Sequence, residues 1–279
     1  VSTLAGSSTT GFLDGPAATA QFNTPTGIAI DGSGSIFIAD QYNSRIRKLS
    51  TSAVVSTYAG TGAFGFSDGP VATAELKYPY GVAVDAAGTV YIADQVNNRI
   101  RVVSTSGIVS TLAGTGVAGY LDGPGATAKF NGPKGIAVDA IGNVYVGEGN
   151  GLRIRKIDVA GNVTTIAGTG VFGYLDGPGT TAMFGVPTAL AVDAVGNIYV
   201  GDVSHIRKID VMNNVTTYAG SGLAGFADGP ALSATFASAE GIAIDAAGNL
   251  YIADATNHRI RKITTAGMVS TLADCGAYG

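Results

Sequence analysis

The sequence predicts an all-β fold, a β-propeller of four-stranded antiparallel blades, with five blades. The first observation is a repeat of 54 residues, shortened to 52 once, in which VSTLAG at 1–6 recurs, unchanged or with one or two substitutions, at 55–60, 109–114, 163–168, 215–220 and 269–274. The second is that each period holds four short apolar runs rich in Val, Ile and Tyr and bounded by turn residues, which is typical of strands. Because one small sheet cannot bury both of its faces, the copies are expected to cover one another.

Each period has the same order of elements. It starts with the VSTLAG-type strand, passes through a Gly-rich connector containing DGP, and ends with three strands, which in the third copy are GIAVDA, NVYVGE and RIRKID. Gly-containing turns such as 246–249 suit tight hairpins, because glycine adopts positive φ without steric cost. The expected domain is a single propeller over 1–279, with blade repeats at roughly 1–54, 55–108, 109–162, 163–214 and 215–268 and a terminal strand at 269–279.

The strand count leaves an alternative open. Five sets of the three inner strands stand beside six VSTLAG-type strands, one at each terminus. A five-bladed ring would use one terminal strand for closure and leave the other spare. A six-bladed ring would need three further strands, so the alternatives are a six-bladed ring or a part of a longer repeat array.

The order P-x-G-I-A-V-D, G-N-x-Y-I-A-D, N-x-R-I-R-K and V-x-T-x-A-G resembles the NHL-repeat β-propeller family over essentially the whole chain. The resemblance implies a propeller fold. Members of that family include RNA binders, adhesion and scaffold domains, and a few lyases and hydrolases. A shared fold does not fix the function, which has to be argued from the site.

The connector contains a G-x-G-x-x-G run at 114–119 that matches a dinucleotide fingerprint. The run recurs in the other repeats, and an aromatic residue and a DGP turn follow it instead of a helix, so we interpret it as structure rather than as a cofactor site. Asp122 is expected to cap a short turn, and Phe130 to pack inward. The equivalents of Phe130 are Phe22, Leu76, Phe184 and Phe236.

Charged residues also recur once per repeat. Three acidic positions account for 15 of the 20 carboxylates, and the third strand holds 13 of the 16 basic residues. We interpret these charges as architecture, with arginines bonding carboxylates and carbonyls between sheets. The alternative is a binding surface formed by a ring of acids or arginines.

The composition excludes several classes of function. Only Lys77, Lys129 and Lys134 lie outside the third-strand motif, and the net charge is −4, so no nucleic-acid partner is expected. The two histidines, His205 and His258, form no expected cluster with carboxylates, so no metal, no cofactor and no catalytic residue is assigned. No membrane insertion is expected, because no apolar run reaches spanning length. Cys275 is the only cysteine and is expected to be a free thiol.

The predicted binding residues lie where the repeats differ, just before the first inner strand and in the turn between the second and third. Both segments should open on one face, around the mouth of a central channel, because in an antiparallel blade these two connections emerge on the same side. Loops on a rigid scaffold often carry function. The candidates are Thr26, Tyr80, Lys134, Thr188 and Glu240, with Tyr42, Tyr78 and His258 beside them.

The predicted function is a non-enzymatic, secreted or cell-surface interaction module, a scaffold that binds a protein, peptide or glycan on this rim. One alternative is a structural subunit that self-associates by pairing a spare terminal strand with another chain, since an unpaired edge invites strand addition. The other is a lyase or hydrolase that would act at the channel mouth.

Overall fold

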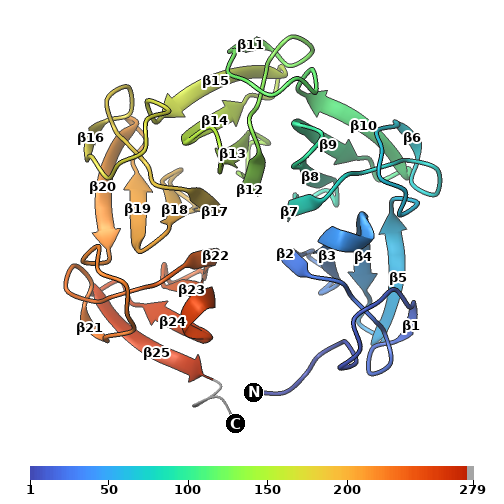
Figure 1. The fold of residues 1–279 in the computed structure, drawn as a ribbon, viewed down its shortest axis with the longest axis horizontal. Helices are drawn as coiled ribbons and strands as arrows, with labels where there is room; N and C mark the ends of the chain where they lie inside the picture. The colour runs from blue at the N-terminus through green and yellow to red at the C-terminus, as the bar shows by residue number, and fades with distance from the viewer. Residues whose placement is uncertain (275–279) are drawn as a thin grey trace. The chain divides into compact units, whose positions relative to one another are not determined.

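The computed structural model describes residues 1–274, which form five antiparallel sheets, one per repeat (Figure 1). The first comprises β1 (Gly15–Pro16), β2 (Pro25–Ile30), β3 (Ile36–Asp40), β4 (Arg45–Leu49) and β5 (Val54–Ala59). The second comprises β6 (Gly69–Pro70), β7 (Pro79–Val84), β8 (Val90–Asp94), β9 (Arg99–Val103) and β10 (Ile108–Ala113). The third comprises β11 (Gly123–Pro124), β12 (Pro133–Val138), β13 (Val144–Glu148), β14 (Arg153–Ile157) and β15 (Asn162–Ala167).

The fourth sheet comprises β16 (Gly177–Pro178), β17 (Pro187–Val192), β18 (Ile198–Asp202), β19 (His205–Ile209) and β20 (Asn214–Ala219). The fifth comprises β21 (Gly229–Pro230), β22 (Ala239–Ile244), β23 (Leu250–Asp254), β24 (Arg259–Ile263) and β25 (Met268–Asp274). Two short 3₁₀ turns follow β3 and β23, namely η1 (Gln41–Asn43) and η2 (Ala255–Asn257). The fold class is the predicted all-β propeller, and the five predicted blades are confirmed.

The prediction of four-stranded blades is wrong, because each sheet has five strands. In the first sheet the order is β1-β5-β4-β3-β2, and Gly15 and Pro16 pair with Val55 and Val54 of the outer strand. We predicted the DGP segment as a turn only. Its Gly-Pro pair lies along the outer strand at the edge of the sheet, a position that proline tolerates because no ladder donor is needed there.

The spare strand lies at the amino-terminal end of the described chain. The VSTLAD copy forms β25 and pairs with β24, and each sheet closes with the VSTLAG-type copy that follows its three inner strands. Residues 1–5 have the same sequence as residues 269–273, VSTLA, and residues 1–6 lie in no strand. A blade therefore runs from a DGP segment to the end of the next VSTLAG-type strand.

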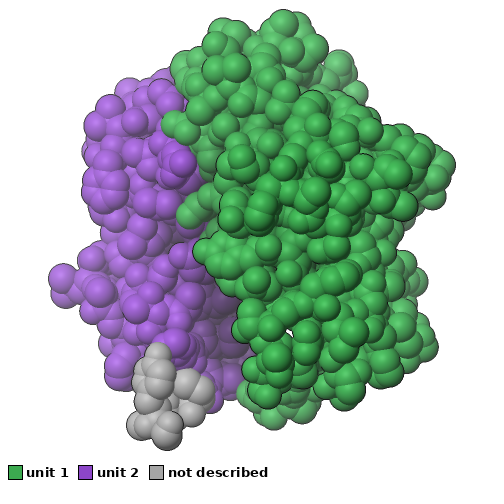
Figure 2. All heavy atoms as spheres, turned by 45° about the vertical axis from the view of Figure 1, so that its right-hand side comes forward, with its two compact units in different colours: residues 1–144, 157–164 green, residues 145–156, 165–279 purple. Residues whose placement is uncertain are grey.

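The described chain forms two compact units, residues 1–144 with 157–164 and residues 145–156 with 165–274 (Figure 2). In unit 1, β2 packs on β7 and β7 on β12. In unit 2, β17 packs on β22. Successive blades thus cover one another through their inner strands within each unit. The predicted inward positions of the connectors are confirmed: Leu76, Phe130, Phe184 and Phe236 are fully buried, and Phe22 is half-buried.

The inner strands of blades 1, 2 and 3 approach closely at glycines, and this gives a first prediction. A Cβ on Gly81 would overlap the carbonyl oxygen of Lys134 and lie 3.0 Å from Ile136 Cγ2. We expect Gly81→Ala to lower the free energy of unfolding by about 1–3 kcal/mol, because the blades would have to move apart. Urea denaturation measures the difference. The control is Gly32→Ala in an exposed hairpin, where a Cβ meets nothing within 4 Å. Equal costs for the two variants would contradict the close approach.

Candidate binding site

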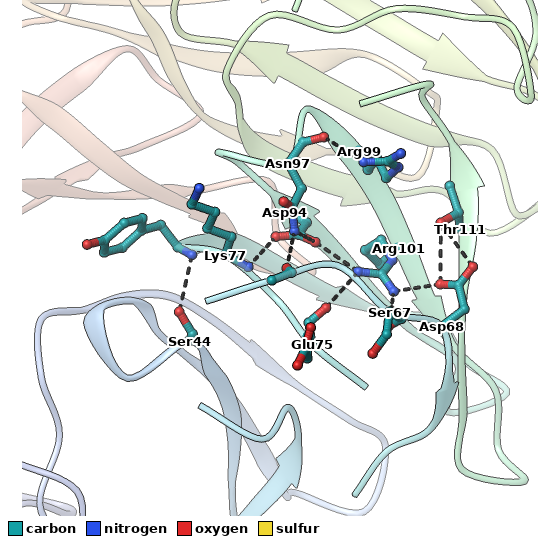
Figure 3. A network of polar contacts seen from close by, with 12 residues as sticks. Ser44, Ser67, Asp68, Glu75, Lys77, Asp94, Asn97, Arg99, Arg101 and Thr111 are labelled. Carbon is teal, nitrogen blue, oxygen red and sulfur yellow. Dashed lines mark hydrogen bonds and ion pairs between the residues drawn. The ribbon is translucent and has the colours of Figure 1, made fainter. Parts of the chain in front are cut away.

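Each blade contains a fully buried arginine that joins the connector to the inner strands. In the second blade, Arg101 Nη1 donates to Asp94 Oδ2 over 2.9 Å, and Nη2 donates to Asp68 Oδ1 over 2.5 Å (Figure 3). The same two nitrogens donate to the carbonyls of Glu75 and Ser67 in the connector. The guanidinium is 0% exposed, so its planar fork organises the blade from inside. The equivalents are Arg47, Arg155, Arg207 and Arg261, all 0% exposed.

These contacts refine two expectations. The buried arginines bond within one sheet and its own connector, because the connector folds back over the face of its own blade. The predicted bonds between blades come from the arginine two residues earlier: Arg45 Nη2 donates to the Thr61 carbonyl, and Arg99 Nη2 to the Thr115 carbonyl, each in the connector of the next blade. The DGP acid does not cap a turn in the described contacts of blade 1. Instead, Asp14 accepts bonds from Arg47 and from the backbone N–H and hydroxyl of Thr57 in the outer strand.

The acidic residues of each repeat also have structural partners. Burial raises the pKa of Asp94, although Asn97, the Lys77 N–H and Arg101 all favour its charged form. The acid after each first inner strand closes a hairpin: Asp85 Oδ1 accepts the N–H groups of Ala87 and Thr89 at 3.0 and 2.8 Å. The acids that end the second inner strands are 0% exposed. The alternative of a binding ring of acids or arginines is therefore wrong for these buried positions.

The predicted rim residues of unit 1 have two different environments. Thr26 Oγ1 donates to the Tyr80 carbonyl of the next blade over 2.7 Å, so this side chain fastens two blades. Lys134 Nζ lies 5.0 Å from the centroid of the Tyr80 ring, in cation–π range. The structure thus brings Thr26, Tyr80 and Lys134 together along three successive inner strands.

The predicted rim residues of unit 2 have three different environments. Thr188 is buried, and its Oγ1 donates to the Ala239 carbonyl over 3.0 Å, the same fastening contact as that of Thr26. Glu240 accepts a bond from Ser238 Oγ over 2.8 Å. His258 is exposed and ends η2 in the left-handed region at φ 53°.

The most prominent feature of the loops in unit 1 is a cluster of three aromatic rings, which we call the aromatic platform: Tyr42, Phe64 and Tyr78. The Tyr42 and Tyr78 rings meet edge to face, with centroids 5.3 Å apart, and Phe64 lies 5.1 Å from Tyr78. Tyr42 and Phe64 are 52% and 58% exposed. Three separate segments supply the rings: η1, the connector of blade 2, and the residue before β7.

Two members of the platform were predicted and one was missed. Tyr42 and Tyr78 were expected on one face, whereas Phe64 belongs to a connector that we interpreted as structural throughout. The available signal was variation: Phe64 stands where the other repeats have Thr10, Ala118, Phe172 and Ala224.

Tyr78 also holds a backbone conformation that is unfavourable for an aromatic residue. Its φ is 52°, and the equivalent residue of the next blade, at φ 62°, is Gly132. A non-glycine residue in this region costs on the order of 1–3 kcal/mol, and such residues cluster at functional sites. Thr24 of the first blade has the same conformation at φ 54°, so this backbone belongs to the repeat, and in the second blade it carries an aromatic ring.

Unit 2 departs from the repeat at the loop after β18, which is two residues shorter. His205 replaces the arginine found at Arg45, Arg99, Arg153 and Arg259. Its ring stacks on Tyr174 at 4.4 Å, whereas Arg45 and Arg259 stack on Phe12 and Phe226 at 3.8 Å. His205 Nδ1 is buried and has no hydrogen-bond partner within residues 1–274.

His205 should make stability depend on pH. Burial, followed by the charge of Arg207, lowers its pKa below 6.5, although Asp176 opposes this. The unfolded chain therefore binds the proton more tightly, so stability present above pH 6.5 is lost as the pH falls through 6.5 and below. Comparing urea denaturation at pH 7.5 and 5.5, we expect the wild type to lose more stability than His205→Gln. Asp202, whose pKa burial raises to about 6, acts with the opposite sign in both proteins. Identical pH slopes would contradict the assignment.

Two features are absent from the part of the chain that the structure describes. Among residues 1–274, no three or more His, Cys, Asp and Glu side chains are grouped so that they could hold a metal ion. No helix in this part has the length and apolar character needed to cross a membrane.

A groove of about 470 Å³ in unit 1, lined by Tyr91, Leu112, Ile157 and residues 158–161 among others, contains none of the rim residues. Cys275 lies outside the described residues.

Comparison with known proteins identifies the repeats. The NHL repeat family model matches residues 22–49 and 236–263. Protein SUPPRESSOR OF QUENCHING 1, chloroplastic, from Arabidopsis thaliana, is 31% identical over 274 residues that cover 91% of the chain. The chain carries NHL repeats. This NHL-repeat chain spans 26% of that relative's length, and 21% of NHL repeat-containing protein 2 from Bos taurus, to which it is 33% identical over 155 residues covering 50% of the chain.

Solved structures share the fold. An auxiliary nutrient binding protein from Bacteroides thetaiotaomicron matches 99% of the NHL-repeat chain and 65% of its own, with a TM-score of 0.70 and 16% identity. A streptogramin B lyase matches 91% of the chain and 70% of its own, with a TM-score of 0.60 and 17% identity. At these identities the likeness concerns the fold alone.

Proposed function

We propose that this NHL-repeat chain is a non-enzymatic, secreted or cell-surface binding module, and that it binds a protein, peptide or glycan through the aromatic platform of unit 1. The observation that carries the proposal is the cluster of Tyr42, Phe64 and Tyr78, three rings from three segments, two of them more than half exposed. Exposed aromatic rings supply large contact areas with little loss of conformational entropy, and they dominate many binding interfaces.

The surroundings of the platform support a ligand with both apolar and polar groups. Tyr78 directly precedes β7, and Tyr80 is the second residue of that strand. Lys134 on β12 lies against the Tyr80 ring, so these two residues add a phenol and a cation. Tyr42 and Tyr78 carry hydroxyl groups at the ring edges, which can bond to a peptide backbone or a sugar.

The test is a screen of glycan and peptide arrays with the purified chain, followed by titration of the best binder. Tyr42→Ala and Phe64→Ala should each weaken binding by about 10- to 100-fold, the range expected for aromatic hot spots. Tyr120→Ala is the control, because Tyr120 is 52% exposed, as Tyr42 is, and lies outside the platform. Binding that survives both platform substitutions, or that falls equally with the control, would contradict the proposal.

A further inference from the structure

The groove of unit 1 lies between the second and third blades. Tyr91 on β8 and Leu112 on β10 line it from the second blade, and Val144, Ile157 and the hairpin at 158–161 line it from the third. Every lining residue belongs to unit 1. The volume of about 470 Å³ falls within the range of roughly 300–1,000 Å³ that small-molecule sites have in proteins. The groove is therefore large enough for a small organic molecule.

Two other blades carry a tyrosine ring where the second blade has Leu112. In the first blade, Tyr58 stands at that position, and its ring meets Phe37 edge to face with centroids 4.8 Å apart. In the fourth blade, Tyr218 meets Tyr199 in the same way at 5.1 Å. Both tyrosines pack against the hydrophobic cluster between their own blade and the next.

The walls around these rings correspond to the walls of the groove. The cluster against which Tyr58 packs includes Val90 and Val103 of the second blade. One repeat later, 54 residues along the chain, the same positions are Val144 and Ile157, which line the groove. A tyrosine ring in the first blade thus lies against the equivalents of the residues that face the groove.

The repeat also becomes more apolar at two further positions around the groove. Val102 pairs with Tyr91 across the sheet, whereas each of the other blades places a lysine over the equivalent ring. Those lysines are Lys48, Lys156, Lys208 and Lys262. Val159 lines the groove and is 68% exposed, in a position where the first, second and fifth blades have threonine. The groove therefore combines a missing ring with a loss of polar neighbours.

We propose that this groove binds a small aromatic molecule, whose ring takes the place that Tyr58 and Tyr218 fill in their own blades. The ring would meet Tyr91 edge to face, an arrangement that aromatic pairs favour. Tyr91 is held ready for this contact, because its hydroxyl donates to Asp85 Oδ2 over 3.1 Å. The lining of the groove includes no residue of the aromatic platform, so this site is additional to the proposed binding function.

The experiment titrates p-cresol, which has the ring of a tyrosine side chain, into the nitrogen-15-labelled chain. We expect saturable shifts of the amide signals of residues 158–161, with a Kd on the order of 1 mM. Leu112→Tyr fills the groove with the chain's own ring and should weaken binding by at least about 10-fold. Val117→Tyr is the control, because it adds a tyrosine at a position that is 59% exposed and outside the groove. No saturable shift in the wild type, or equal Kd values for wild type and Leu112→Tyr, overturns the proposal.

Two further measurements keep the result independent of folding. Leu112→Tyr should leave the melting temperature unchanged or raise it, whereas a fall of several degrees would show that the groove has no room for a ring and would overturn the proposal. Val159→Asp changes an exposed side chain, so the fold should persist while the new charge beside an apolar ligand weakens p-cresol binding by about 10-fold. An unchanged Kd for Val159→Asp also counts against the site. Tyr42→Ala should not alter the Kd, so this proposal and the proposed function can fail separately.

Discussion

Replacing Arg101 with methionine will lower the free energy of unfolding by about 3–5 kcal/mol, the cost of removing one partner of a buried ion pair. Asp94 is 0% exposed, and without the guanidinium that faces it at 2.9 Å it would either hold an unpaired charge in the interior or have to bind a proton. The carbonyls of Glu75 and Ser67 would lose a charged donor as well. Methionine fills much of the volume of the side chain, so the loss reports on the polar contacts rather than on a cavity.

Urea denaturation measures the loss, and Lys77→Met is the matched control. It removes the same charge type from a side chain near the network, while the Lys77 backbone N–H still donates to Asp94 Oδ1 over 2.8 Å. The control should cost no more than about 0.5 kcal/mol. Arg101→Met combined with Asp94→Asn should cost clearly less than the sum of the two single changes, because the pair is coupled. Additive losses, or a cheap Arg101→Met, would show that the buried arginine does not organise the blade.

The repeat made the strands predictable and left their edges unpredictable. Three inner strands and an outer strand per blade follow from runs such as GIAVDA and VSTLAG, since alternation and turn residues are local signals. The pairing of Gly15 with Val55 is not local. It depends on how the connector folds over its own blade, and the contact between Arg47 and Asp14, which are 33 residues apart in the sequence, fixes that fold. The same contacts explain why the buried arginines bond within a blade, whereas Arg45 and Arg99 reach the connector of the next blade.

The site was predictable only in part for a similar reason. Repeat comparison placed Tyr42 and Tyr78 on one face, and their rings are in contact. It could not tell that Thr26 and Thr188 bond to the inner strand of the next blade, whereas Tyr80 and Lys134 contact each other through their side chains. Those contacts depend on the distance between blades, which glycines such as Gly27 and Gly81 set. Phe64 escaped because its motif is structural in most repeats, and a single large side chain changes what that loop presents to solvent.

Phe236→Ala will lower the free energy of unfolding by about 3–5 kcal/mol, comparable to the loss at Arg101. The Phe236 ring is 0% exposed and fills the cluster between the fourth and fifth blades, against Tyr199 and Ile206 on one side and Ile252 on the other. Both blades belong to unit 2. Truncation would leave a cavity lined by rigid strands on two sheets, which have little freedom to collapse into it.

Two further variants separate a lost core contact from a lost aromatic ring, again by urea denaturation. Phe226 lies in the same connector but is 55% exposed and stacks on Arg259 at 3.8 Å, so Phe226→Ala should cost only about 0.5–1 kcal/mol. Phe236→Leu should recover most of the loss, because Leu76 occupies the equivalent position of the second blade at 0% exposure. If Phe236→Leu is as costly as Phe236→Ala, the ring itself matters, through its place 5.0 Å from the guanidinium of Arg261, and the connector's inward residue is more than a filler between blades.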